Sequence, residues 1–261
     1  MADLLAPGLW WLHGTRGSNV FLVEADDGQL ALIDTGFGSS ATAILAALEG
    51  HGRPLSAILL THAHRDHSGA AAAVRSATGA RVALGKADCL PRDGGFVLHP
   101  TLGRTHPWRR FTGRAKSQPA DTPVDLPLSS ESEPLPGIRA IPVPGHTPGA
   151  YCYIVDRLGA AFAGDLVISH DGELTRSMKF ANSDDALYLQ SIRDFARVAP
   201  DAGLPGHGVP VMTGFGEQLR GLAELPRRSG FRVGIERFRR LARFARGLTT
   251  PRRPGNPTGG S

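Results

Sequence analysis

Short apolar runs separated by turn residues fill most of the chain, and their lengths predict strands more often than helices. Two of the runs flank Asp26-Asp27-Gly28, which predicts a β-hairpin between them. The predicted strands cover residues 20–23, 30–33, 57–60, 81–84, 138–143, 151–155 and 160–163.

Helical periodicity appears between these strands. Residues 41–48 predict a helix capped by Ser39 or Ser40, and an alanine-rich helix begins near residue 68. A third helix is predicted over 184–198, with acidic residues in its first turn. Its apolar positions near one face are Leu187, Ile192, Phe195 and Val198. Strands with interspersed helices predict a layered α/β sandwich, and the repeated order of elements in the second half suggests an internal duplication.

The pattern weakens between residues 89 and 136, a stretch rich in glycine, proline and polar residues. A loop of this length inside a domain is typically a lid or an insertion, so we predict a lid or connector between two halves. We expect residues 1–226 to form one catalytic domain, followed by a basic amphipathic helix over 227–248 and a disordered tail over 249–261.

Composition describes an ordinary soluble globule, with 41% hydrophobic and 20% charged residues and a net charge of +5. Eleven arginines and two glutamates lie between positions 219 and 254, so the positive charge belongs to the carboxy-terminal part. A helix with a solvated basic face is favoured there over contact with a membrane surface or nucleic acid. Two cysteines, no signal peptide and no membrane-length apolar run predict a cytoplasmic protein.

The segment His62-Ala63-His64-Arg65-Asp66-His67 places four candidate metal ligands within six residues, after a predicted strand. Alternate residues leaving a strand point the same way, so His62 and His64 can face one ion. The helix that follows would bring Asp66 and His67 to the other side of the same pocket. Imidazole and carboxylate donors suit zinc or a similar first-row metal, and this interpretation is favoured over a polar loop whose histidines bond to the backbone.

Four further motifs place polar side chains at strand ends or in glycine turns. His146 lies in Pro-Gly-His-Thr-Pro-Gly, Asp165 in Gly-Asp, His207 in Pro-Gly-His-Gly, and Asp34 in Asp-Thr-Gly. Each would be weak alone. Together with the segment that begins at His62, and in this order over residues 8–215, they resemble the metallo-β-lactamase superfamily.

This resemblance implies a four-layer αβ/βα sandwich with two divalent metal ions between the sheets. Zinc is favoured, with iron and manganese as alternatives. The implied ligands are His62, His64 and His146 for one ion, Asp66, His67 and His207 for the second, and Asp165 bridging them. Asp66 could also accept a proton, and Asp34 would orient a ligand histidine or the local backbone instead of capping a turn. The remaining histidines, His13, His51, His99, His106 and His170, receive no metal role.

The aspartate at the bridging position resembles the glyoxalase II, lactonase and phosphodiesterase branches more than the members that open β-lactams. Leu166-Val167-Ile168 occupies the stretch where the lactonase branch has a tyrosine, which argues against homoserine-lactone hydrolysis by that route. We therefore predict a hydrolase of a small-molecule ester, thioester or lactone. Its alternatives are a phosphodiesterase or nuclease on the same metals, a mono-iron persulfide dioxygenase, and a silent binding module. Neither the substrate nor the oligomeric state follows from the sequence.

Overall fold

The computed structural model describes residues 2–98 and 121–226. The predicted basic helix over 227–248 and the tail over 249–261 lie outside the described residues, as do His99 and His106. In the described part, no helix combines the length and the apolar character needed to cross a bilayer.

The first half of the chain forms a seven-stranded mixed sheet. Its strands, in spatial order, are β1 (Ala2–Ala6), β2 (Leu9–Leu12), β3 (Phe21–Glu24), β4 (Leu30–Ile33), β5 (Leu55–Leu59), β6 (Arg81–Gly85) and β10 (Leu126–Leu128). The predicted hairpin is confirmed, since β3 pairs antiparallel with β4. Strands β4, β5 and β6 then run parallel, so their carboxyl ends meet at one edge of the sheet.

The second half forms a five-stranded sheet of β11 (Ser132–Leu135), β12 (Ile138–Pro142), β13 (Tyr151–Val155), β14 (Ala160–Gly164) and β17 (Ala202–Pro205). Strands β14 and β17 are parallel, and both end next to a proposed ligand. A short hairpin of β15 (Val167–His170) and β16 (Glu173–Arg176) lies beyond β14.

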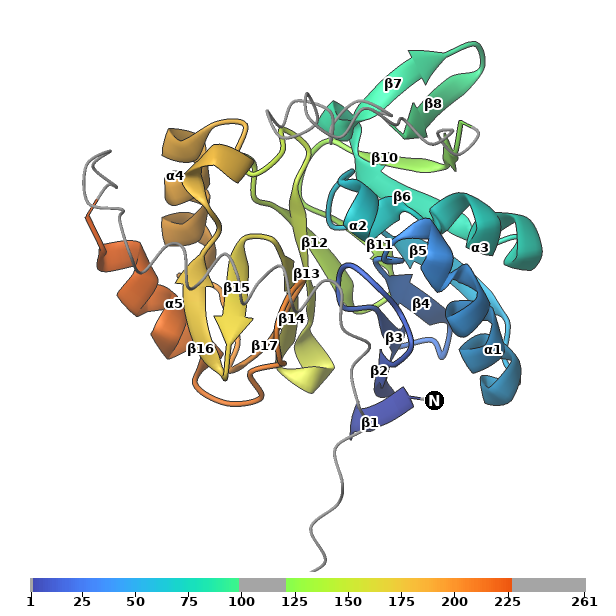
Figure 1. Ribbon diagram of the computed structural model, residues 1–261, viewed down its shortest axis with the longest axis horizontal. Coiled ribbons are helices and arrows are strands. Elements are labelled where there is room, and N and C mark those ends of the chain that lie inside the picture. The colour runs from blue at the N-terminus through green and yellow to red at the C-terminus, as the bar shows by residue number, and fades with distance from the viewer. Residues whose placement is uncertain (1, 99–120, 227–261) are drawn as a thin grey trace, which may run out of the picture.

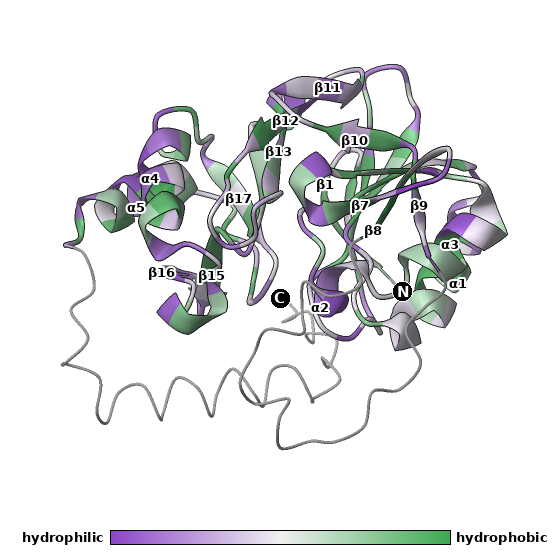
Figure 2. Ribbon diagram, turned by 90° about the horizontal axis from the view of Figure 1, so that it is seen from above, coloured by the Kyte–Doolittle hydropathy of each residue, from purple (hydrophilic) through white to green (hydrophobic). Residues whose placement is uncertain are grey.

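Helices cover the outer face of each sheet, which gives the predicted four-layer αβ/βα sandwich (Figure 1). Helices α1 (Ala41–His51) and α3 (Ala71–Thr78) pack on the first sheet, and α4 (Asp185–Phe195) and α5 (Phe215–Glu224) on the second. The inner faces of both sheets share one apolar core, in which Phe21, Tyr153 and Phe162 are almost fully buried. Apolar residues accordingly concentrate between the layers (Figure 2).

The helix ends and faces differ in part from the prediction. Helix α4 ends at Phe195, and Val198 beyond it is exposed, as is Leu187 in its first turn. Tyr188 and Leu189 are buried instead, because they face the second sheet. Helix α1 begins directly after Ser40 as predicted, but the Ser40 hydroxyl bonds the backbone of a neighbouring loop and makes no cap hydrogen bond.

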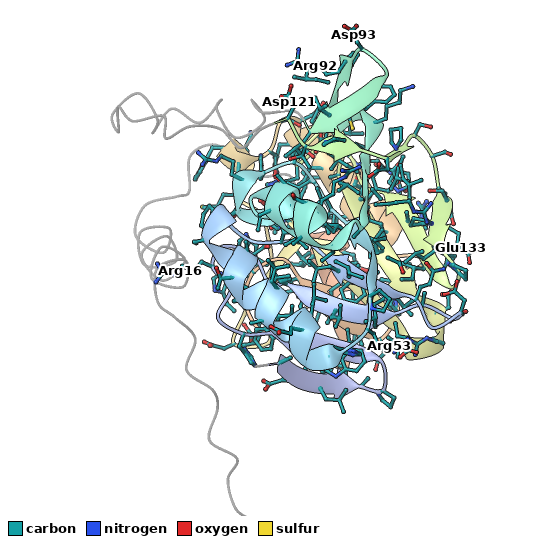
Figure 3. All side chains as sticks on the ribbon, turned by 90° about the vertical axis from the view of Figure 1, so that its right-hand side faces the viewer. Arg16, Arg53, Arg92, Asp93, Asp121 and Glu133 are labelled. Carbon is teal, nitrogen blue, oxygen red and sulfur yellow. The ribbon has the colours of Figure 1, made fainter. Side chains whose placement is uncertain are left out.

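The stretch between 89 and 136 is more regular than the sequence suggested. Its described parts contain β10, β11 and a three-stranded sheet of β7 (Cys89–Arg92), β8 (Gly95–Leu98) and β9 (Pro123–Val124). An ion pair of 3.2 Å joins Arg92 to Asp121 at the outer end of this sheet (Figure 3). Strands of two to four residues leave too little hydrophobic periodicity to be recognised. A role as a lid stays a prediction.

Candidate metal centre

The histidine-rich segment leaves the end of β5 in extended conformation and then turns into the short helix α2 (Arg65–Ser68). This puts His62 and His64 on the extended part, and Asp66 and His67 on the helix, as the spacing predicted. His62 and His67 are buried, while Asp66 is partly exposed.

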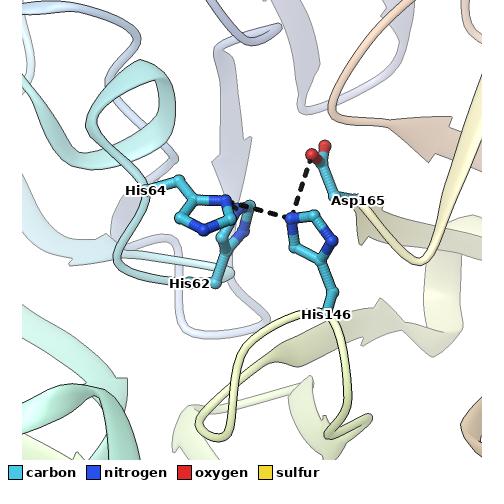
Figure 4. Close-up of side chains that lie close together, drawn as sticks. All are labelled: His62, His64, His146 and Asp165. Atoms are coloured by element: carbon cyan, nitrogen blue, oxygen red, sulfur yellow. Dashed lines mark hydrogen bonds and ion pairs between the residues drawn. The ribbon is translucent and has the colours of Figure 1, made fainter. Parts of the chain in front are cut away.

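One group of four side chains comprises His62, His64, His146 and Asp165, whose ligand atoms lie within 4.8 Å of one another. Nδ1 of His64 is 3.0 Å from Nε2 of His62 and 3.0 Å from Nε2 of His146 (Figure 4). Asp165 follows β14 and places Oδ2 3.3 Å from Nε2 of His146. Nitrogen donors converging at this spacing, with one carboxylate oxygen, form a donor set typical of zinc and other first-row metals.

A second group comprises Asp66, His67 and His207. Nε2 of His67 lies 3.2 Å from Nε2 of His207, and Oδ2 of Asp66 lies 3.3 Å from the same His207 nitrogen. His207 reaches this place because β17 ends at Pro205, next to the end of β14. The structure therefore brings together all seven residues that the resemblance implied as ligands.

Asp165 stands between the two groups. Its Oδ2 faces His146, whereas its Oδ1 lies 3.2 Å from Nε2 of His67 and 3.3 Å from Nε2 of His207. Oδ1 is buried and receives no well-formed hydrogen bond from any described residue. A buried carboxylate whose oxygens face imidazole nitrogens on both sides suits a shared cation, so this donor set fits a metal at each group with Asp165 between them.

Electrostatics prepare the first group for a cation. Burial, reinforced by the neighbouring histidines, lowers the pKa of His62 well below its usual value. Burial likewise lowers the pKa of His64, to about 4. Both imidazoles are therefore neutral at physiological pH, and a neutral imidazole is the form that binds a metal.

The second group is organised around carboxylates. Burial opposes the charge of His67, but Asp165 and Asp34 outweigh it and raise the pKa of His67 well above its usual value. Burial also opposes the ionisation of Asp165, yet electrostatic interaction with the neighbouring His207 and His67 holds the pKa of Asp165 low. The metal-free protein thus keeps a proton on His67, which a cation would replace.

Asp34 lies beside the ligands as predicted, at the end of β4. Its Oδ2 is 2.8 Å from Nδ1 of His67, and its two oxygens accept hydrogen bonds from the amide and the hydroxyl of Thr61. The Asp34 backbone has a φ of 56°, in the left-handed region that non-glycine residues seldom adopt. Backbone strain of this kind is concentrated at functional sites.

Three polar residues that contact the predicted ligands or their loops were not predicted from the sequence. Oδ1 of Asn182 lies 3.0 Å from Nδ1 of His146, which leaves the other ring nitrogen for a metal. The side chain of Asn19 donates to the carbonyls of Pro205 and Gly208 on either side of His207. Asp88 accepts hydrogen bonds from Ala63 and Thr147, which lie on two loops that carry predicted ligands. Each of these residues contacts partners that are distant in the sequence. The position of Asp88 shortly after a predicted strand is the one feature of the sequence that could have pointed to it.

The described histidines without a predicted metal role, His13, His51 and His170, belong to neither group. His13 pairs with Asp3 at 2.7 Å, and His51 packs edge-on against Trp10 at 4.6 Å. His170 ends β15 and is half-buried. Leu166, Val167 and Ile168, which follow Asp165, are apolar and buried.

A metal-binding cluster at the edge of an αβ/βα sandwich defines the class of protein. The model of the metallo-beta-lactamase superfamily matches residues 13–207, and the chain belongs to this superfamily of metal-dependent hydrolases. The fold is also that of TTHA1623 in a di-iron-bound form, with a TM-score of 0.58 and 28% identity over 76% of this chain and 91% of that one.

Two curated relatives carry names that describe an activity. Thioesterase pkgB of Emericella nidulans is 27% identical over 79% of this chain. A hydroxyacylglutathione hydrolase of Cereibacter sphaeroides is 32% identical over 69% of this chain. The matches span 49% and 58% of those two proteins, so the chain corresponds to about half the length of each.

Proposed function

We propose that the protein is a hydrolase that uses two divalent metal ions to cleave an ester, a thioester or a lactone. The carboxylate of Asp165 carries the proposal, because its two oxygens face different histidine groups. His62, His64 and His146 would hold one ion, and Asp66, His67 and His207 the other. Bound divalent cations supply an activated water and a Lewis acid for the scissile carbonyl, with the pKa of the water lowered to about 7.

The protein's own residues have three tasks in this reaction. Asp165 holds the two groups at a fixed separation, and Asp34 fixes the ring of His67 through Nδ1. Asp66 is the more exposed of the two proposed carboxylate ligands, with 24% of its side chain accessible against 10% for Asp165. That exposure suits Asp66 to accept a proton and pass it to solvent.

Acyl substrates are favoured over phosphodiesters by the names of the two relatives, thioesterase and hydroxyacylglutathione hydrolase. Zinc is our proposed metal because histidine and carboxylate donors suit it, although the same donors accept iron, which the related TTHA1623 binds as a pair. We propose a small-molecule substrate and a cytoplasmic location. A nucleic-acid or membrane contact through residues 227–248 is the disfavoured alternative.

The test begins with elemental analysis of the purified protein. Metal is then removed with a chelator and replaced separately by zinc, iron or manganese. Each form is assayed with a thioester, a lactone, a phosphodiester and, under an oxygen electrode, glutathione persulfide. We expect about two ions per chain and turnover of an acyl substrate. Turnover of the phosphodiester alone, or oxygen consumption with one iron per chain, would replace our proposal with one of its alternatives.

A further inference from the structure

Asp88 is a fully buried carboxylate outside the proposed ligand set. It ends a short 3₁₀ helix, Lys86–Asp88, directly after β6, and its relative exposure is 0%. The structure describes no arginine or lysine paired with it. An ionised group buried in this way is expensive unless its surroundings compensate it, so its place needs an explanation.

Three hydrogen bonds show what Asp88 holds. Oδ2 accepts from the amide of Ala63 at 3.0 Å and from the hydroxyl of Thr147 at 2.7 Å. Oδ1 accepts from the amide of Gly149 at 2.7 Å. All three partners are donors, so this environment suits an ionised Asp88, whose two oxygens can only accept hydrogen bonds.

The partners of Asp88 are direct neighbours of proposed ligands. Ala63 lies between His62 and His64, and Thr147 follows His146. One carboxylate therefore ties the loop from the first sheet to the loop from the second, next to three of the four side chains of the first group. Asp34, beside the second group, contacts the predicted ligand His67 directly, whereas Asp88 contacts residues that adjoin the predicted ligands.

Close backbone approach makes this bridge possible. A Cβ added to Gly85 would come 2.0 Å from the carbonyl oxygen of Gly149. A Cβ added to Gly149 would come 2.6 Å from the amide nitrogen of Asp88. Glycine at both positions lets the end of β6 touch the loop of His146, so the short Asp88 side chain can reach both ligand loops.

We propose that Asp88 is a positioning residue that sets the affinity and geometry of the first metal group. Its negative charge complements a cation held by neutral histidines, and its hydrogen bonds fix the separation of the two loops that carry them. This inference rests on the proposed ligand set. It predicts a metal-binding defect that is specific to one of the two ions.

The variant Asp88→Asn keeps the shape but places an amide donor against donors. We expect it to weaken binding of one of two ions by about 10- to 100-fold, as measured by zinc titration against a chelating dye. With cobalt(II) as the probe, the visible spectrum of that ion should change as well. The matched control is Asp125→Asn, because Asp125 also accepts from a backbone amide of β6, Val82, but lies away from the ligands. That control should bind two ions normally.

Three results separate the possibilities. Unchanged affinity and an unchanged cobalt spectrum in Asp88→Asn would overturn the positioning role. Failure of the wild-type protein to bind any metal would instead overturn the proposed function. If Asp88→Asn does not fold, Thr147→Val removes one of the three donors with little change in shape, and unchanged zinc affinity in that variant would likewise overturn the inference.

Discussion

Oδ2 of Asp34 lies 2.8 Å from Nδ1 of His67, and both side chains are almost completely buried. The contact fixes which ring nitrogen of His67 faces the second metal group. Because the same carboxylate also accepts from Thr61, its orientation is fixed by the strand end that precedes the histidine segment. Asp34, Thr61 and His67 therefore form one hydrogen-bonded unit.

The variant Asp34→Asn tests this unit. Asparagine tolerates the left-handed backbone of this position, so the fold should be preserved, but the charge opposite His67 is lost. We expect zinc affinity at the second group to fall by about 10- to 100-fold, with circular dichroism unchanged. If calorimetric titration gave the variant the same two zinc affinities as the wild-type protein, the role of Asp34 would be contradicted.

Removal of ligands should separate the two groups. His62→Ala removes a donor from the first group only, whereas Asp165→Ala removes the carboxylate that faces both. We expect His62→Ala to keep about one ion and Asp165→Ala to lose affinity for both, each with a large loss of activity and a largely intact fold. Full metal content in both variants, measured by elemental analysis, would refute the assignment. His13 belongs to neither group and pairs with Asp3, so His13→Ala is the control and should keep its full metal content.

The metal-free protein should lose stability in acid through His64. Its folded pKa is about 4, below the unfolded value of 6.5, so the unfolded state binds the proton first. This contribution is complete above pH 6.5 and is lost as the pH falls towards 4, with a slope of up to about 1.4 kcal/mol per pH unit. Urea unfolding of wild type and His64→Gln at several pH values measures the difference. A stability difference between them that does not vary between pH 7 and pH 4.5 would show that His64 titrates normally.

Gly206 precedes His207 and leaves room for two ligands. An added Cβ would lie 2.5 Å from Cε1 of His67 and 2.9 Å from Oδ1 of Asp165. Gly206→Ala should therefore displace both side chains and reduce metal content and activity. Gly221→Ala provides the control, since its Cβ meets nothing within 4 Å and alanine should stabilise helix α5 by about 0.5–1 kcal/mol. Normal zinc stoichiometry in Gly206→Ala would show that the centre tolerates the displacement.

The proposed ligands could be predicted from the sequence because each lies in a short motif next to a strand end. His146 and His207 lie in glycine turns, and Asp165 directly follows β14, so each leaves a local pattern. Each pattern is weak alone, and it was the order of the motifs, through the resemblance to the superfamily, that joined them into one ligand set. The order of strands and helices likewise predicted the sandwich. These features depend on neighbours within a few residues.

The supporting residues and the small sheet could not be predicted in the same way. Asp88 meets Gly149, 61 positions away, and Asn182 meets His146, 36 positions away, so neither contact leaves a local pattern. Strand β9 has two residues, too few to show alternation. The face of α4 was misjudged at Leu187 because exposure there is decided by the sheet and the neighbouring helix.

Both metal groups take donors from each half of the sandwich: His62 and Asp66 come from the first half, and His146 and His207 from the second. Occupancy of either group by a cation would consequently cross-link the halves. Binding at about 1,000 times its dissociation constant adds about 4 kcal/mol to folding stability. A shortage of metal would then make the polypeptide more susceptible to proteases as well as inactive. The supply of metal would in that way regulate how much of the protein a cell retains.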